Sequence, residues 1–323
     1  MDFQILISNL TNPTLLFFLL GIFAAVVKSD LEIPSPTIKF ISLYLLFSIG
    51  FKGGQELANS VFSTEIYWSL LFGLCIAFLI PVYVFFLLKN RLGASDAGAV
   101  AAAYGSVSAV TFVAAGSFLE YQQIRFGGHM VAVMAMMEAP AIIAGVILIM
   151  RYDKESAEQK QASGLGGIIR HSFTNSSVLM VMGSLVIGVI SDSKQAEGIK
   201  PFTTDIFKGF LAIFLLEMGM VTARRFSAFR KYGAFATLTG IVLPAVNGSV
   251  VAWASSFVTL DVGNRFIFAI LAASASYIAV PAAMRLAAPR ADPGLYIPMA
   301  LGITFPFNIT IGMPLYLSII QHT

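Results

Sequence analysis

The chain has 323 residues, of which 57% are hydrophobic and only 11% charged, with a mean hydropathy of +0.83 and a formal net charge of +3. This composition leaves too little polar surface to cover a soluble globule. The excess positive charge is spread along the chain without a dense basic block, which argues against a nucleic-acid-binding protein.

Apolar runs long enough to cross a lipid bilayer as helices recur along the chain. They predict ten spans near residues 12–28, 36–51, 66–89, 96–118, 128–150, 174–191, 204–222, 231–257, 264–289 and 294–319. We therefore expect an all-α integral membrane protein. The first run lacks a basic leading segment and a small-residue cleavage site, so we expect no removed signal peptide.

Ten spans would place both termini on the same side of the membrane. When the loops are assigned alternately to two faces, the face opposite the termini collects 14 of the 20 Lys and Arg residues. The other face keeps Lys52, Arg125, Lys194, Lys200, Lys208 and Arg265. Because cytoplasmic loops carry the excess of basic residues, we expect both termini on the non-cytoplasmic side of the plasma membrane.

The chain lacks the usual signatures of metal or nucleotide chemistry. Its single cysteine, Cys75, can form neither an intrachain disulfide nor a cysteine-based metal cluster. The three histidines have no metal-site spacing, and no GxxxxGK[ST] phosphate loop occurs. We therefore expect no enzyme and no ATP-driven pump, but a secondary transporter driven by an ion gradient.

The two halves of the sequence resemble each other weakly, at an offset near 168 residues. The matches set residues 46–51 over 215–220, 104–112 over 274–282, and 138–145 over 304–311. They predict two five-helix repeats, residues 1–150 and 174–323, joined by a cytoplasmic linker at 151–173. Since five is odd, the second repeat would be inverted, and a binding site is then expected near the membrane midplane.

Two predicted spans carry small and hydroxyl residues at their centres, YGSVSAVT at 104–111 and SASYIAVP at 274–281. Gly105 would let the backbone leave helical geometry, and Pro281 suits the first turn of a new half-helix. The serines are good N-cap residues. Ordinary small-residue packing is the alternative interpretation.

If both helices break, two half-helix N-termini meet and together can hold a small anion. The opposing half-helix ends offer carbonyl oxygens that suit sodium. Glu138, Thr304 and Asn308 are the predicted ion ligands of the neighbouring spans. Proton coupling and a structural hydrogen bond are the alternative roles for Glu138, and Glu217 is a second acid within a span.

Four motifs, YGSVSAVTF, MEAP, SASYIAVPAAMR and GITFPFN, together resemble the SbtA-type sodium-dependent bicarbonate transporter superfamily, from the first span to the last. The resemblance implies gate and core domains interleaved across both repeats, and two broken, crossing helices. It also implies sodium:bicarbonate symport by an elevator-type motion and a homotrimer in the bacterial inner membrane. Cyanobacterial members further imply a PII-like regulator on the cytoplasmic face.

Carried onto this chain, the resemblance implies an anion site with a sodium site beside it. The anion site comprises Gly105, Ser106, Ser108, Ala109, Ser276, Ala279 and Val280. The sodium site comprises Ser108, Thr111, Glu138, Ser274, Thr304 and Asn308. Sodium is the coupling ion, and no other metal or cofactor is expected. A sodium-coupled carrier of another small carboxylate and a membrane-embedded ion-binding regulator are the alternatives.

Overall fold

The computed structural model describes residues 13–59, 64–153, 170, 174, 176–229 and 233–323. Within these residues the chain is helical and contains no β-strand, which confirms the all-α prediction. Most of the predicted linker, 151–173, lies outside the described residues.

The helices of the first half are α2 (Pro13–Val26), α3 (Ser35–Ala58), α4 (Thr64–Leu92), α5 (Ala94–Gly105), α6 (Ala109–Tyr121) and α7 (His129–Tyr152). The second half begins with α10 (Ser176–Ile190), α11 (Ser193–Glu197), η2 (Pro201–Asp205), α12 (Phe207–Phe229), α13 (Gly233–Ala254) and η4 (Ser255–Phe257). It continues with α14 (Val262–Ala273), α15 (Ala279–Ala287), α16 (Pro293–Pro298), η5 (Met299–Thr304), α17 (Phe305–Phe307), η6 (Asn308–Gly312) and α18 (Met313–Gln321).

Six helical segments are long and apolar enough to cross a membrane. They are Thr64–Leu92, Ala94–Tyr121, His129–Tyr152, Pro201–Arg224, Gly233–Phe257 and Pro293–Gln321. The other four predicted spans, which correspond to α2, α3, α10 and α14–α15, do not meet both criteria. The protein is therefore a membrane protein, and the ten-span layout stays a prediction.

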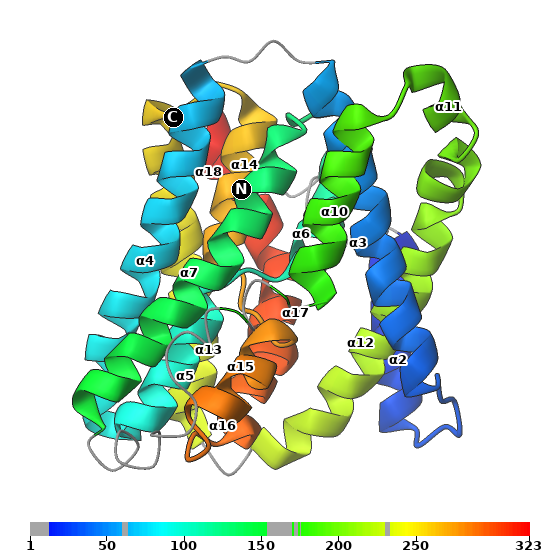
Figure 1. Cartoon of the computed structure of the whole chain (residues 1–323). Helices are drawn as coiled ribbons and strands as arrows, with labels where there is room; N and C mark the ends of the chain where they lie inside the picture. Colours follow the sequence, from blue (N-terminus) through cyan, green and yellow to red (C-terminus); the bar gives the residue numbers. More distant parts are fainter. Residues whose placement is uncertain (1–12, 60–63, 154–169, 171–173, 175, 230–232) are drawn as a thin grey trace.

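Two helix pairs pack so closely that their contacts require glycine. In the pair α2–α12, a Cβ on Gly21 or on Gly219 would overlap backbone atoms of the other helix. In the pair α3–α10, the same holds for Gly50 and Gly188. Small residues of this kind let membrane helices approach backbone to backbone. Each half thus packs its first helix against the second helix of the other half (Figure 1).

The interrupted helices α5–α6 and α14–α15 lie at the centre of the remaining helices. The helix α4 packs along α5 and α7, while α13 packs along α14 (Figure 1). Alanines make up half of α5, and the helix is fully buried from Ala99 to Ala103. Their short side chains let α5 lie deep among its neighbours, and this positions the polar residues that follow α5 inside the protein.

Polar contacts mark the two opposite ends of the helix array. At one end, Glu65 at the start of α4 accepts a hydrogen bond of 3.1 Å from the amide of Asn264. At the other end, beyond the last turn of α4, the Ser95 hydroxyl donates to Asp153 at 2.6 Å, and Arg290 lies 3.6 Å from the same carboxylate. These contacts show which helix termini share an end of the protein. The end that holds Glu65 and Asn264 is the Glu65 end.

Candidate functional site

The first predicted interruption is present in the structure. Helix α5 ends at Gly105 and α6 begins at Ala109, with extended backbone between them. Ser108 is the N-cap of α6, and its side-chain oxygen accepts a 3.2 Å hydrogen bond from the backbone N–H of Thr111. The position of the break is thereby confirmed, and so is the capping role expected of a serine.

Gly105 has a different role from the one predicted for it. Its φ angle is not positive, so the break does not use the conformational freedom of glycine. A Cβ at this position would overlap the ring of Pro81 and lie 3.2 Å from the Cβ of Ala141. The residue must therefore be glycine because α5 packs closely on α4 and α7, and the prediction of backbone freedom was wrong.

The second predicted interruption is also present. Helix α14 ends at Ala273, and α15 begins at Ala279 after five non-helical residues. Pro281 is the third residue of α15, where its missing N–H leaves no hydrogen bond unmade within the helix. Ile278 holds the N-cap position without a side-chain cap, so the first N–H groups of α15 remain available to another acceptor.

The two interruptions contact each other directly. The backbone N–H of Ser276 donates to the carbonyl of Ala103 at 2.8 Å, and the N–H of Ser108 donates to the hydroxyl oxygen of Ser274 at 3.0 Å. The N-terminal ends of α6 and α15 therefore lie in one region, together with the C-terminal ends of α5 and α14. Partial positive and partial negative helix ends are thus neighbours inside the protein.

A small cavity of about 20 Å³ lies where the interruptions meet. It is lined by Val107, Ser108, Ala109, Glu138, Ser177, Ser276, Tyr277, Ile278 and Ala279. A volume of this size holds one water-sized species. Glu138 is only 7% exposed, and its Oε1 has no hydrogen-bond partner among the described residues.

Five predicted site residues share this cavity, namely Ser108, Ala109, Glu138, Ser276 and Ala279. Five others flank it without lining it, namely Gly105, Ser106, Thr111, Ser274 and Val280. Of these, Ser106 is fully buried, and its hydroxyl makes no hydrogen bond within the described part of the chain. Their predicted roles in binding stay predictions.

Thr304 and Asn308 do not line the cavity. The Thr304 hydroxyl donates to the carbonyl of Gly240 at 2.7 Å and lies 2.7 Å from the hydroxyl of Tyr104. The Asn308 amide donates to the carbonyl of Ala273, the last residue of α14, at 2.8 Å. Both side chains therefore hold the interrupted helices against α13 and the last helices, and their predicted role as sodium ligands stays a prediction.

Sequence reasoning missed two polar side chains that line the cavity. Ser177 reaches it from α10, which belongs to a different part of the fold from the interruptions. Nothing in the apolar run that contains Ser177 distinguishes it from Ser176 beside it. Tyr277 lies within the run SASYIAVP but was not predicted as a site residue, because the serines beside it are the better capping residues.

The polar groups of this site are few and differ in kind. Among the described residues, no three His, Cys, Asp or Glu side chains converge. The cavity instead offers one carboxylate, serine hydroxyls and helix termini, which suit a hard monovalent cation and a small anion.

Two comparisons bear on the family. No curated protein matches the chain. A family model of the Na⁺-dependent bicarbonate transporter superfamily matches residues 13–321. The match confirms the resemblance carried by the four motifs, and because this is a family of transporters, it also confirms that the protein is not an enzyme. The chain belongs to the Na⁺-dependent bicarbonate transporter superfamily.

Proposed function

We propose that the protein is a sodium:bicarbonate symporter that binds both ions where the two interrupted helices meet. The observation that carries this proposal is the carboxylate of Glu138, which is buried beside two helix N-termini with one oxygen unpartnered. Membership of a sodium-dependent bicarbonate transporter family supports the same pair of ions.

The coupling cation binds at Glu138. An ionised carboxylate out of contact with water is costly unless it is paired, and a sodium ion in the small cavity supplies the missing charge. The hydroxyl oxygens of Ser108 and Ser276 line the same cavity and complete an oxygen shell. A proton on Glu138 would also remove the charge, so the dependence of transport on sodium and on pH separates the two cations.

The anion binds at the N-termini of α6 and α15. The first N–H groups of a helix have no acceptor within that helix, and the macrodipole adds a partial positive charge. Ala109 and Ala279 begin the two helices, and both line the cavity. A cavity of about 20 Å³ has no room for bicarbonate beside sodium. The site must therefore widen before the anion binds.

The widening fits an elevator-type motion of two groups of helices. In this proposal α2, α3, α10 and α12 form the gate domain, and the interrupted helices belong to the core domain. The close glycine contacts recur at matching places in the two halves, Gly21 with Gly188 and Gly50 with Gly219. This recurrence supports inverted repeats at 1–150 and 174–323, with a midplane site between them.

The remaining expectations belong to the assembled protein. The proposal includes a homotrimer in the bacterial inner membrane, with both termini outside the cytoplasm. It also includes a PII-like partner on the cytoplasmic face. These features rest on the family resemblance and on the distribution of basic residues.

A symporter for another small carboxylate is the second candidate, because helix termini recognise the negative charge of an anion more than its chemical identity. The experiment uses proteoliposomes containing the purified protein and labelled bicarbonate, with an inward gradient of either sodium or potassium. We expect uptake only with sodium, and weak competition by excess formate or acetate. Sodium-driven uptake of the carboxylates in preference to bicarbonate would favour the second candidate. Sodium binding without any uptake would favour a membrane-embedded regulator.

A further inference from the structure

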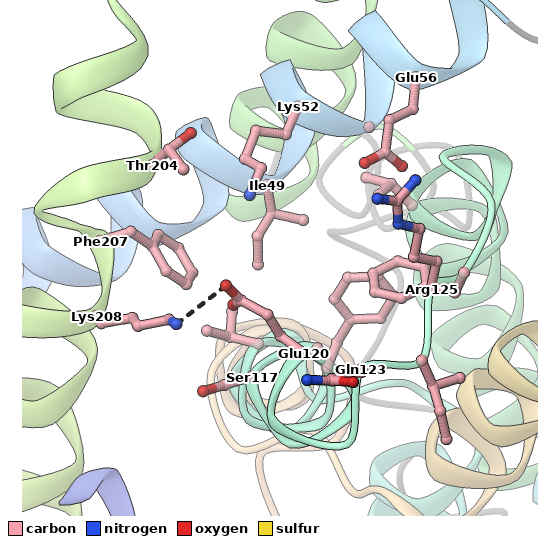
Figure 2. Close-up of a pocket in the computed structure, with 17 residues that line it drawn as sticks. Ile49, Lys52, Glu56, Ser117, Glu120, Gln123, Arg125, Thr204, Phe207 and Lys208 are labelled. Atoms are coloured by element: carbon pink, nitrogen blue, oxygen red, sulfur yellow. Dashed lines mark ion pairs between the residues drawn. The ribbon is translucent and has the colours of Figure 1, made fainter.

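A second and much larger cavity, of about 660 Å³, lies between α3, α6 and α12 (Figure 2). Its walls carry five charged side chains: Lys52, Glu56, Glu120, Arg125 and Lys208. These residues stand near the ends of α3 and α6, in the loop before α7 and at the start of α12. That loop is tied to the Glu65 end of the protein, because the N–H of Gly127 donates to Asn264 at 2.7 Å.

The large cavity extends along α6 toward the candidate site. Phe112, Gly116 and Glu120 line it, and this four-residue spacing places them on one face of the helix. Phe112 follows Ala109 by three residues, so the cavity ends roughly 5 Å along the helix from the candidate anion site. The ring of Phe112 packs edge-on against Phe126, with centroids 5.8 Å apart, and both residues line the cavity.

The charges around the cavity are not balanced. Lys208 of α12 forms a 3.0 Å ion pair with Glu120 of α6. Figure 2 shows the carboxylate of Glu56 facing the guanidinium of Arg125, while the ammonium of Lys52 points into the cavity. Within the part of the chain that the structure describes, Lys52 forms no ion pair. Lys52 and Arg125 both act electrostatically on Glu56. With three cations against two carboxylates, the cavity carries an excess of one positive charge.

We propose that this cavity is an anion-capture vestibule and that Lys52 binds a small monoanion in it before the anion reaches the helix N-termini. The inference rests on the proposed function, since it needs an anion as the substrate. Low-dielectric walls focus the field of a cation within a cleft and raise the local concentration of anions. An ammonium group suits transient binding of an anion, because it acts as a point charge and does not form the bidentate hydrogen bonds of a guanidinium group.

The first experiment measures the charge of the vestibule without requiring transport. The chain has one cysteine, Cys75, so a Cys75→Ser background with Ser117→Cys places a single thiol in the cavity wall. The rates of modification by an anionic and a cationic methanethiosulfonate reagent are compared, each divided by its rate with a free thiol. We expect the anionic reagent to be favoured by about tenfold.

Charge removal on α3 then identifies the cation. Lys52→Gln should abolish the preference for the anionic reagent, while Lys52→Arg retains it. Lys39→Gln is the matched control, because Lys39 is also an exposed lysine of α3 but lies near the other end of that helix. Equal rates for both reagents in the parent protein, or the same loss of preference in Lys39→Gln as in Lys52→Gln, would overturn the proposal.

The second experiment links the vestibule to the substrate. For sodium-driven bicarbonate uptake at low ionic strength, Lys52→Gln should raise KM by about fivefold and leave kcat unchanged, because steering affects capture and not the later steps. High salt should reduce the difference. An unchanged KM in Lys52→Gln would contradict the capture role. If the protein carried no bicarbonate at all, the labelling ratio would still report the charge of the cavity, so the two proposals fail separately.

Discussion

The small cavity at the helix interruptions and the vestibule differ in how far their charged side chains are exposed to water. In the small cavity, a single carboxylate that is 7% exposed faces serine hydroxyls and helix ends. In the vestibule, carboxylates and cations stand together in reach of water, and the side chains of the Lys208–Glu120 pair are 58% and 62% exposed. A buried unpaired charge is costly, whereas exposed charges are screened. Selective ion binding is therefore expected in the first cavity, and attraction of ions in the second.

The largest effect is expected from removing the charge in the small cavity. Glu138→Gln should lower sodium-driven bicarbonate uptake by roughly a hundredfold, since losing one partner of a buried ion pair costs about 3 kcal/mol or more. Uptake is measured in proteoliposomes at a sodium concentration well below the parent protein's KM for sodium, where a loss of sodium affinity lowers the rate in proportion. The matched control is Glu217→Gln, which removes an acid from α12 outside the small cavity and should leave uptake within about twofold. Similar losses of uptake in both variants would contradict the claim that Glu138, and not Glu217, binds the coupling ion.

The same carboxylate should make stability depend on sodium. In sodium-free potassium buffer, Glu138→Gln should melt at a higher temperature than the parent protein, because the variant lacks the unpaired charge. Added sodium should raise the melting temperature of the parent but not of the variant, since only a ligand that binds the folded state stabilises it. Thermal unfolding in detergent measures both. A sodium-induced shift of equal size in the two proteins would contradict the assignment.

The packing of α5 on α4 should be sensitive to the size of one side chain. Gly105→Ala should destabilise the protein by about 1–3 kcal/mol, because the added methyl group overlaps Pro81 in a packed core. Gly183→Ala is the control, since a Cβ there meets no atom within 4 Å. Chemical or thermal unfolding compares the two. Equal stabilities would indicate that α4 and α5 are further apart than the structure places them.

Asn308 allows a structural role to be separated from ion binding. Asn308→Ala removes the donor to the Ala273 carbonyl and should cost about 1–3 kcal/mol of stability, because that buried acceptor loses its partner. If the role is only structural, sodium affinity stays unchanged. Thr310→Ala is the control, since the Thr310 hydroxyl bonds only within its own helical segment. A fall in sodium affinity comparable to that of Glu138→Gln would instead make Asn308 a sodium ligand.

The smallest effect is expected in the vestibule. Lys208→Gln breaks the ion pair with Glu120, but exposed pairs contribute less than about 1 kcal/mol. Its melting temperature should therefore stay within about two degrees of the parent value. A large loss of stability would show that the charges of the vestibule are not screened by water and contribute to stability as a buried charge does.

The sequence predicted the parts of the site that follow from local chemistry. Ser108 and Pro281 mark the starts of half-helices because capping and a missing N–H act over one helical turn. Glu138 was identifiable because an acidic side chain within an apolar span is energetically costly and therefore usually functional. The structure adds that Ser108 and Glu138 line one cavity.

What the sequence did not predict depends on contacts between distant segments. Gly105 faces Pro81 of another helix, and Ser177 reaches the cavity from α10. Thr304 and Asn308 are predicted ion ligands, and the sequence did not predict their hydrogen bonds to Gly240 and Ala273. A hydroxyl or an amide in an apolar span satisfies either role, and only its neighbours in space distinguish the two.

Binding of radiolabelled sodium to the purified protein tests the central claim most directly. Equilibrium binding in potassium buffer should be saturable for the parent protein and for Glu217→Gln. It should fall by roughly a hundredfold in affinity for Glu138→Gln, as expected for the loss of a charged ligand. Sodium binding of parental affinity in Glu138→Gln would contradict the assignment of the sodium site to the cavity between the interrupted helices.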